Sequence, residues 1–171
     1  MFGGVLMKQT NILRIGKVSS TNPKAATVKV VFSDMDNMVS HDLPLLFPQG
    51  LKNKAYAMPD VGENVVCLFI EQGVGDGFCI GSFYTLSDTP PVTNQDKVHY
   101  SFEDGSHVEY DRSKCKLTVH AVGDVQIEGR NITLSGGTIQ INGDITLNGS
   151  TTLSGNVSLS GSVSCPGYCK C

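Results

Sequence analysis

The chain has 171 residues and a formal net charge of −3, and 19 of its residues are glycine. This acidic balance excludes nonspecific nucleic-acid binding through a basic surface, and no apolar run reaches the ~18 residues of a membrane-spanning helix. The apolar start, 1–7, lacks the cationic beginning of a signal peptide, so we expect a protein made in the cytoplasm. Low charge with abundant glycine favours β-structure.

Residues 1–86 predict a small β-barrel. Runs of alternating apolar residues are separated by turn signals such as 20–23 and 59–62. Five short strands in this length are typical of an OB-like barrel, which we interpret as a docking module. The expected strands are Ile12–Val18, Ala26–Phe32, Ser40–Phe47, Asn64–Ile70 and Phe78–Tyr84.

Such a barrel can also serve as a binding module. Recognition of single-stranded nucleic acid needs a basic groove and aromatic platforms, but Lys and Arg are scattered here and Trp is absent. Recognition of an envelope glycan or peptide by the barrel stays open as the alternative function.

Residues 87–122 predict a linker followed by a neck. The stretch 87–97 contains two prolines and is too short for an inserted domain. Three short strands separated by turns follow it, Val98–Phe102, Ser106–Asp111 and Leu117–Ala121. We place the start of the last region at residue 123.

Residues 123–171 differ in composition and carry a repeat. Two basic and three acidic side chains would suggest a flexible linker. However, glycine recurs every six residues from Gly137 to Gly167, and apolar residues follow at the second and fourth positions after most of these glycines. Period-2 alternation inside a period-6 repeat predicts strands joined at glycine corners.

One chain of this repeat cannot enclose a core, because each strand offers only two small apolar residues and its edges stay unpaired. Three chains wound around one axis would bury those residues and pair every strand. We therefore predict an all-β fold, an OB-like barrel followed by an intertwined trimeric β-helix, or needle. A hexapeptide-repeat acyltransferase is disfavoured because no aliphatic residue precedes these glycines. The expected trimer core comprises Ile139, Ile141, Ile145, Leu147, Leu153, Val157, Leu159 and Val163.

Three of the six cysteines cluster near the C-terminus. Threefold symmetry would turn each inward cysteine into a ring of sulfurs, and thiolates suit zinc, ferrous iron or an iron–sulfur centre. We expect one metal site per trimer at this apex, with Cys169 and Cys171 as the first ligands and Cys165 next. Interchain disulfides in an oxidising exterior and plain packing of thiols are the alternatives.

The other polar and reactive side chains suggest no catalysis. Cys67 and Cys79 lie in apolar runs and are interpreted as core fillers, not reactive thiols. We find no nucleophile–His–acid set and no phosphate-binding loop, so we expect no enzyme. No role is assigned to Cys115, and no metal is predicted at His99, His107 and His120.

Five motifs occur in order along the chain: RIGKV at 14–18, ATVKVVF at 26–32, MPDVGENVV at 58–66, GFCIGSFY at 77–84 and DGSHVEYD at 104–111. Together with the hexad tail they resemble the phage baseplate assembly protein V family, the central spike of contractile tails. The resemblance covers nearly the full length. It implies an OB barrel and a trimeric β-helix with a membrane-piercing tip.

This resemblance implies a mechanical role in the baseplate of a phage tail or of a released tail-derived bacteriocin particle. The barrel would dock on the hub that ends the tail tube, and sheath contraction would drive the needle through the target envelope. Larger relatives carry a lysozyme domain, for which 87–97 leaves no room. Compact relatives often end in an iron-binding His-x-His motif, whereas this chain has cysteines there, which leaves the identity of an apex metal open.

Overall fold

The computed structural model describes residues 12–70 and 74–161, which are β-strand or irregular chain apart from one 3-10 turn, Ser33–Met35. This composition agrees with the predicted all-β class. No helix in these two ranges is long and apolar enough to cross a membrane. The chain divides after Asp124 into two units, which are described separately below.

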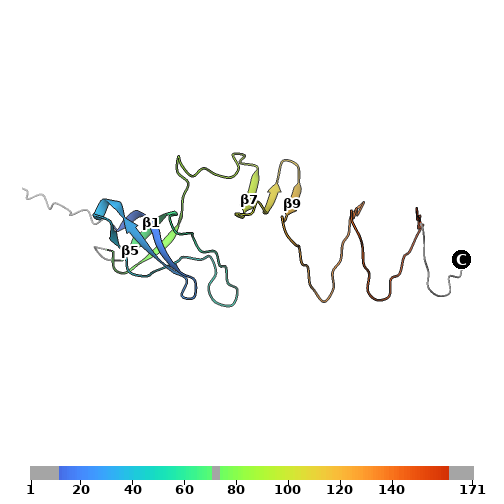
Figure 1. The fold of residues 1–171 in the computed structure, drawn as a ribbon, viewed down its shortest axis with the longest axis horizontal. Coiled ribbons are helices and arrows are strands. Elements are labelled where there is room, and N and C mark those ends of the chain that lie inside the picture. The colour runs from blue at the N-terminus through green and yellow to red at the C-terminus, as the bar shows by residue number, and fades with distance from the viewer. Residues whose placement is uncertain (1–11, 71–73, 162–171) are drawn as a thin grey trace, which may run out of the picture. The chain divides into compact units, whose positions relative to one another are not determined.

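The N-terminal sheet has the strand order β3–β2–β1–β5–β6, and β4 also pairs with β2. Figure 1 labels its two central strands, β1 and β5. All of these pairs are antiparallel. Four of the five predicted strands lie close to their expected positions. The strands are β1 (Leu13–Asn22), β2 (Thr27–Phe32), β3 (Met38–Val39), β4 (Leu43–Pro44), β5 (Asn64–Phe69) and β6 (Gly77–Ser82).

The prediction of one strand over Ser40–Phe47 is wrong. The structure has two short strands, β3 and β4, on either side of Ser40. The Ser40 hydroxyl accepts a hydrogen bond from the Val30 amide at 2.9 Å, so a side chain takes the place of a ladder acceptor. Pro44 then ends β4, since proline has no amide to donate to a ladder.

One isolated bridge joins the two ends of this sheet among the described residues. Leu45 pairs with Cys79 of β6, and the Leu46 amide donates to the Cys79 carbonyl at 3.0 Å. A continuous ladder does not run around the described strands, so they form no closed barrel. The OB-like barrel remains a prediction.

The core of the N-terminal unit lies on the inward face of β1, β2, β5 and β6. Phe32 and Phe69 meet edge to face there, with ring centroids 5.7 Å apart. Gly16 allows β2 to approach, because a Cβ at this position would lie 2.5 Å from Val30 Cγ1. The expected burial of two cysteines is confirmed. The buried apolar residues are Val18, Val28, Val30, Phe32, Leu43, Val65, Cys67, Phe69 and Cys79.

The predicted neck strands form a separate antiparallel sheet, in the order β7 (Lys97–Ser101), β8 (His107–Asp111) and β9 (Lys116–His120). Asp111 stabilises the turn into β9: its Oδ1 accepts hydrogen bonds from the Ser113 amide at 3.0 Å and hydroxyl at 2.6 Å. The bond from this hydroxyl holds the pKa of Asp111 below its ordinary value.

Residues 123–161 form no strand within one copy of the chain. The segment 125–161 runs as an open series of wide turns (Figure 1). The predicted β-helix therefore remains a prediction, since a strand is defined by the partner that it pairs with.

Candidate functional site

The hexad segment repeats one backbone geometry at its glycines. Gly143, Gly149, Gly155 and Gly161 all have positive φ, from 112° to 132°. Residues with a Cβ seldom adopt these values. No atom lies within 4 Å of where a Cβ would stand at any of these four glycines. The backbone conformation, and not lack of space, therefore requires glycine every six residues.

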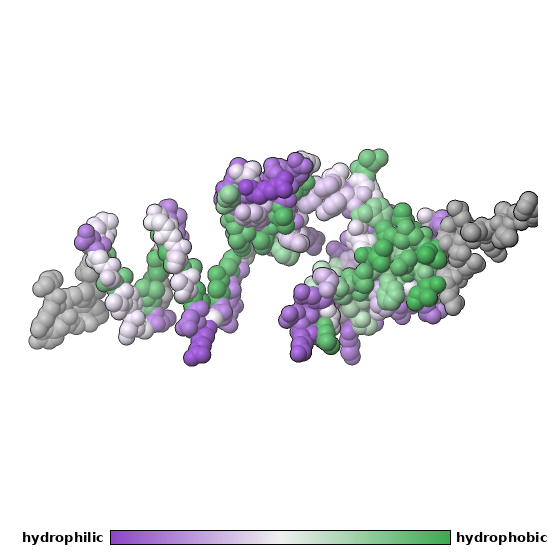
Figure 2. Space-filling model, turned by 180° about the vertical axis from the view of Figure 1, so that it is seen from behind, coloured by the Kyte–Doolittle hydropathy of each residue, from purple (hydrophilic) through white to green (hydrophobic). Residues whose placement is uncertain are grey.

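The aliphatic side chains of this segment are uncovered in a single chain. The described members of the predicted trimer core are 54% to 70% exposed, and Figure 2 shows apolar surface recurring along the segment. Long apolar rows in water usually mark an interaction surface. The described members are Ile139, Ile141, Ile145, Leu147, Leu153, Val157 and Leu159, and Val163 lies outside the described residues.

Polar side chains between these residues gather on the other side of the chain. Gln126 is hydrogen-bonded to Glu128, and Gln140 donates to the Asn142 side-chain oxygen at 3.2 Å. Side chains two residues apart share one side of an extended chain. These pairs agree with the predicted alternation of apolar and polar positions.

The backbone of the segment has no partner within one copy. No backbone-to-backbone hydrogen bond joins residues of 123–161. Backbone amides and carbonyls that become buried need hydrogen-bond partners. Whatever covers the aliphatic rows must therefore also provide hydrogen-bond partners for the backbone of the segment. Another chain of β-structure can supply both the cover and the ladder.

The neck sheet presents a second uncovered apolar face. The register of β7, β8 and β9 aligns apolar side chains in two rows that cross all three strands, one beginning at Val98 of β7 and the other at Tyr100 of β7. These side chains are 37% to 68% exposed. Sequence reasoning missed this face, although the alternation of Val98, Tyr100 and Phe102 signals it. The rows are Val98, Tyr110 and Leu117, and Tyr100, Val108 and Val119.

The apolar alternation of β9 continues along the sequence into the hexad segment. Leu117 and Val119 occupy odd-numbered positions, and so do Val125 and Ile127, with Ala121 and Gly123 between them. All four larger side chains are exposed in the single chain. In the sequence, the odd-numbered apolar positions of the neck therefore continue with the same period into the first hexad.

The opposite face of the neck sheet is polar and carries three stacked histidines. The centroid of the His107 ring lies 5.3 Å from that of His99 and 5.1 Å from that of His120. Glu109 lies 2.9 Å from the Lys97 ammonium and 3.0 Å from His99 Nδ1. The hydrogen bond from Lys97 holds the pKa of Glu109 below its ordinary value. No group of three or more potential ligands is gathered for a metal within the described ranges.

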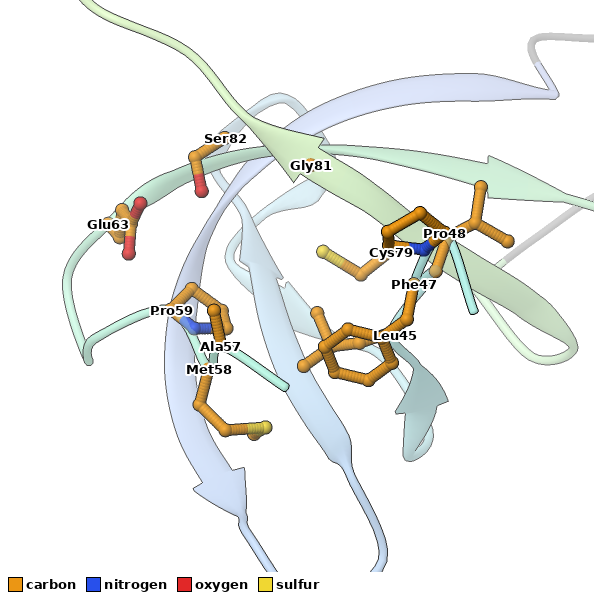
Figure 3. A pocket seen from close by; sticks show the side chains of 11 residues that line it. Leu45, Phe47, Pro48, Ala57, Met58, Pro59, Glu63, Cys79, Gly81 and Ser82 are labelled. Carbon is orange, nitrogen blue, oxygen red and sulfur yellow. The ribbon is translucent and has the colours of Figure 1, made fainter. Parts of the chain in front are cut away.

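A cleft of about 330 Å³ lies between β6 and the chain around 45–59 (Figure 3). Its lining is mainly apolar, with Glu63 as its charged member. Phe47 of the lining stacks on Tyr56, with ring centroids 6.1 Å apart. The lining residues offer no cationic side chain to a phosphate. Cys79 is also part of the wall.

The predicted metal ligands Cys165, Cys169 and Cys171 lie outside the described residues. The apex metal therefore stays a prediction. The exposed Cys115 is a free thiol at the turn that begins β9.

The described residues thus define an all-β chain in which an N-terminal sheet and a neck precede a hexad segment with an exposed apolar side. No protein-family model matches the chain. The chain is similar to the spike protein of Escherichia phage P2, with 25% identity over 112 residues. The match covers 66% of this chain and 52% of that protein, so the chain spans about half the length of this relative. The similarity supports a relation to phage tail spikes.

Proposed function

We propose that this chain is the central spike of a contractile tail or tail-like particle, of the baseplate assembly protein V type. The observation that carries the proposal is the hexad segment, whose regular aliphatic rows and backbone lack partners in a single copy. The similarity to a phage spike protein supports the setting. Three copies would give the segment its core and its ladder.

In this proposal the neck takes part in the same assembly. Its apolar face follows the sequence register of the needle core, so the rows at Val98 and Tyr100 would be covered by the other copies. The histidine row would then remain on the outside of the neck. Assembly of the whole region would bury apolar surface that one chain leaves in water.

The proposed task is mechanical and involves no catalysis. The N-terminal domain docks on the hub and caps the tail tube, and the needle faces the target cell. Sheath contraction supplies the energy, while interchain ladders and rows of Ile, Leu and Val keep the needle from buckling. A rigid narrow tip concentrates this force on a small area of the envelope.

The trimer is tested by Leu147→Asp, with Thr146→Asp as its matched control. Wild-type protein should have three times the chain mass of 18.3 kDa by light scattering. Asp at 147 would place three carboxylates on the threefold axis without counter-charges, so assembly should fail. Asp at 146 should leave the mass unchanged because this position faces outward. An intact, equally heat-resistant Leu147→Asp trimer contradicts the inward assignment.

The role as a spike is tested on particles from the producing cells. Antibodies against the full chain, imaged with gold labels, should mark one end of tail-like particles. Deletion of the coding sequence should abolish particles or their killing or infection, and the wild-type chain should restore them. Normal, active particles without the chain would overturn this role even where the trimer is confirmed.

We also propose that the apex of the trimer holds one metal through Cys169 and Cys171, with Cys165 as the next ligand. The metal would hold the three copies together at 165–171, where the sequence offers few large apolar residues. Elemental analysis of protein purified without chelator should find iron or zinc at about one site per trimer. Loss of this metal in a Cys169→Ser, Cys171→Ser variant is expected. Metal-free wild-type trimer contradicts the proposal.

A further inference from the structure

Two core cysteines face each other across the N-terminal sheet. Cys67 of β5 is the direct register partner of Cys79 of β6, beside a bulge in which the register shifts between Val66 and Cys67. Both side chains are fully buried free thiols. Opposed residues of an antiparallel pair have Cα atoms about 4.5–5.5 Å apart, a separation within the ~4.4–6.8 Å that disulfides span.

The two thiols belong to register partners and are not equivalent. Hydrogen bonding from the Cys67 thiol to the Cys79 thiolate lowers the pKa of Cys79. A bond from the Gly81 backbone acts in the same direction. The same contact, together with burial, raises the pKa of Cys67. The thiolate is the reactive form, so the lowered pKa and the place of Cys79 in the cleft wall both favour Cys79 as the nucleophile of the pair.

Access to the pair also favours Cys79. This residue belongs to the wall of the 330 Å³ cleft, together with Leu45 and Met58, whereas Cys67 does not. Figure 3 shows the Cys79 side chain among the lining residues. A molecule the size of a hydroperoxide fits this space. Because both cysteines are 0% exposed, it would reach Cys79 first, and only when the cleft wall opens locally.

We propose that Cys67 and Cys79 form a redox-active pair that hydroperoxides convert to an intramolecular disulfide. The Cys79 thiolate attacks one peroxide oxygen, the O–O bond breaks, and the leaving hydroxide takes up a proton to become water. The sulfur of Cys67 then attacks the resulting sulfenic acid, the S–O bond breaks, and the departing hydroxide takes the Cys67 proton as a second water. Two thiols are oxidised and one peroxide is reduced.

The disulfide would link β5 to β6 inside the core. A link of this kind restricts the unfolded chain and stabilises the fold. The proposal does not depend on the role as a spike, although a particle released from the cell would meet the oxidising conditions that the reaction requires. Spike function and disulfide formation can therefore fail separately.

Peptide mapping of the full chain tests the link. Reduced protein is treated with hydrogen peroxide, quenched, unfolded, alkylated and digested with trypsin. Both cysteines lie in one peptide, 55–97, because no Lys or Arg stands between Ala55 and Lys97. The expected peptide is two hydrogens lighter and unalkylated, and dithiothreitol reverses the change. A peptide in which both cysteines are alkylated, or each is oxidised without a link, overturns the proposal.

Single substitutions separate the two roles. In Cys67→Ser the sulfenic acid on Cys79 has no resolving thiol, so a dimedone probe should label Cys79. In Cys79→Ser, Cys67 should stay unlabelled, and in the control Cys115→Ser the link should form as in wild type. Equal labelling of Cys67 and Cys79 contradicts the assignment of the nucleophile. If a serine variant fails to fold by circular dichroism, mapping of wild-type protein still decides whether the link forms.

Discussion

Ser40 satisfies the backbone of a buried strand at the point where the ladder is interrupted. Its amide donates to the Val30 carbonyl at 2.8 Å, and its hydroxyl accepts from the Val30 amide at 2.9 Å and donates to the His41 carbonyl at 2.7 Å. The side chain is buried. One hydroxyl therefore serves two backbone groups inside the sheet, where water cannot easily replace it.

Removal of this hydroxyl should destabilise the N-terminal unit. Ser40→Ala leaves the buried Val30 amide without its acceptor, which costs about 1–3 kcal/mol. Urea unfolding of the full chain, followed at one protein concentration, measures the change. Ser19→Ala is the control: the Ser19 hydroxyl also bonds to a strand carbonyl, of Lys29, but at an exposed position, so its loss should cost less than ~0.5 kcal/mol. Equal costs for both variants would contradict the role given to Ser40.

Residue-level prediction from the sequence succeeded for burial and failed for pairing. The apolar surroundings of Cys67 and Cys79 predict two buried thiols, and both are buried. Their direct opposition depends on the register of β5 and β6, which includes a bulge. A bulge shifts the pairing by one residue, and nothing in the local alternation of these strands specifies it.

At the scale of elements, strands were predictable where apolar alternation is long and ends at clear turns. β5 and the three neck strands meet both conditions. The segment from 38 to 47 does not, since a single buried hydroxyl and Pro44 divide it into two short strands. The alternation of apolar residues in the neck sequence was also sufficient to predict its apolar face. That face became evident only when the register placed the side chains of three strands in shared rows.

At the scale of the whole molecule, the repeat predicts a structure that a single copy of the chain cannot complete. Hexad spacing predicts the positive φ of Gly143 and its successors through the need for corners. It also predicts the exposed aliphatic row, because apolar positions alternate with polar ones. A ladder between copies depends on a partner. The structure of a single chain therefore shows the glycine corners and the apolar rows that the ladder needs, but not the strand pairing itself.

Hydrogen exchange on the full chain tests whether that ladder forms. Amides of 139–159 lack backbone acceptors within one copy, so slow exchange there can come only from association. We expect protection of at least about a hundredfold over unstructured rates in wild type and in Thr146→Asp. Leu147→Asp should lose this protection while β1 and β5 keep theirs, since those strands pair within the chain. Exchange of 139–159 at unstructured rates in wild-type protein of trimeric mass would mean that the copies associate without an interchain ladder, and the intertwined needle would then be the wrong arrangement.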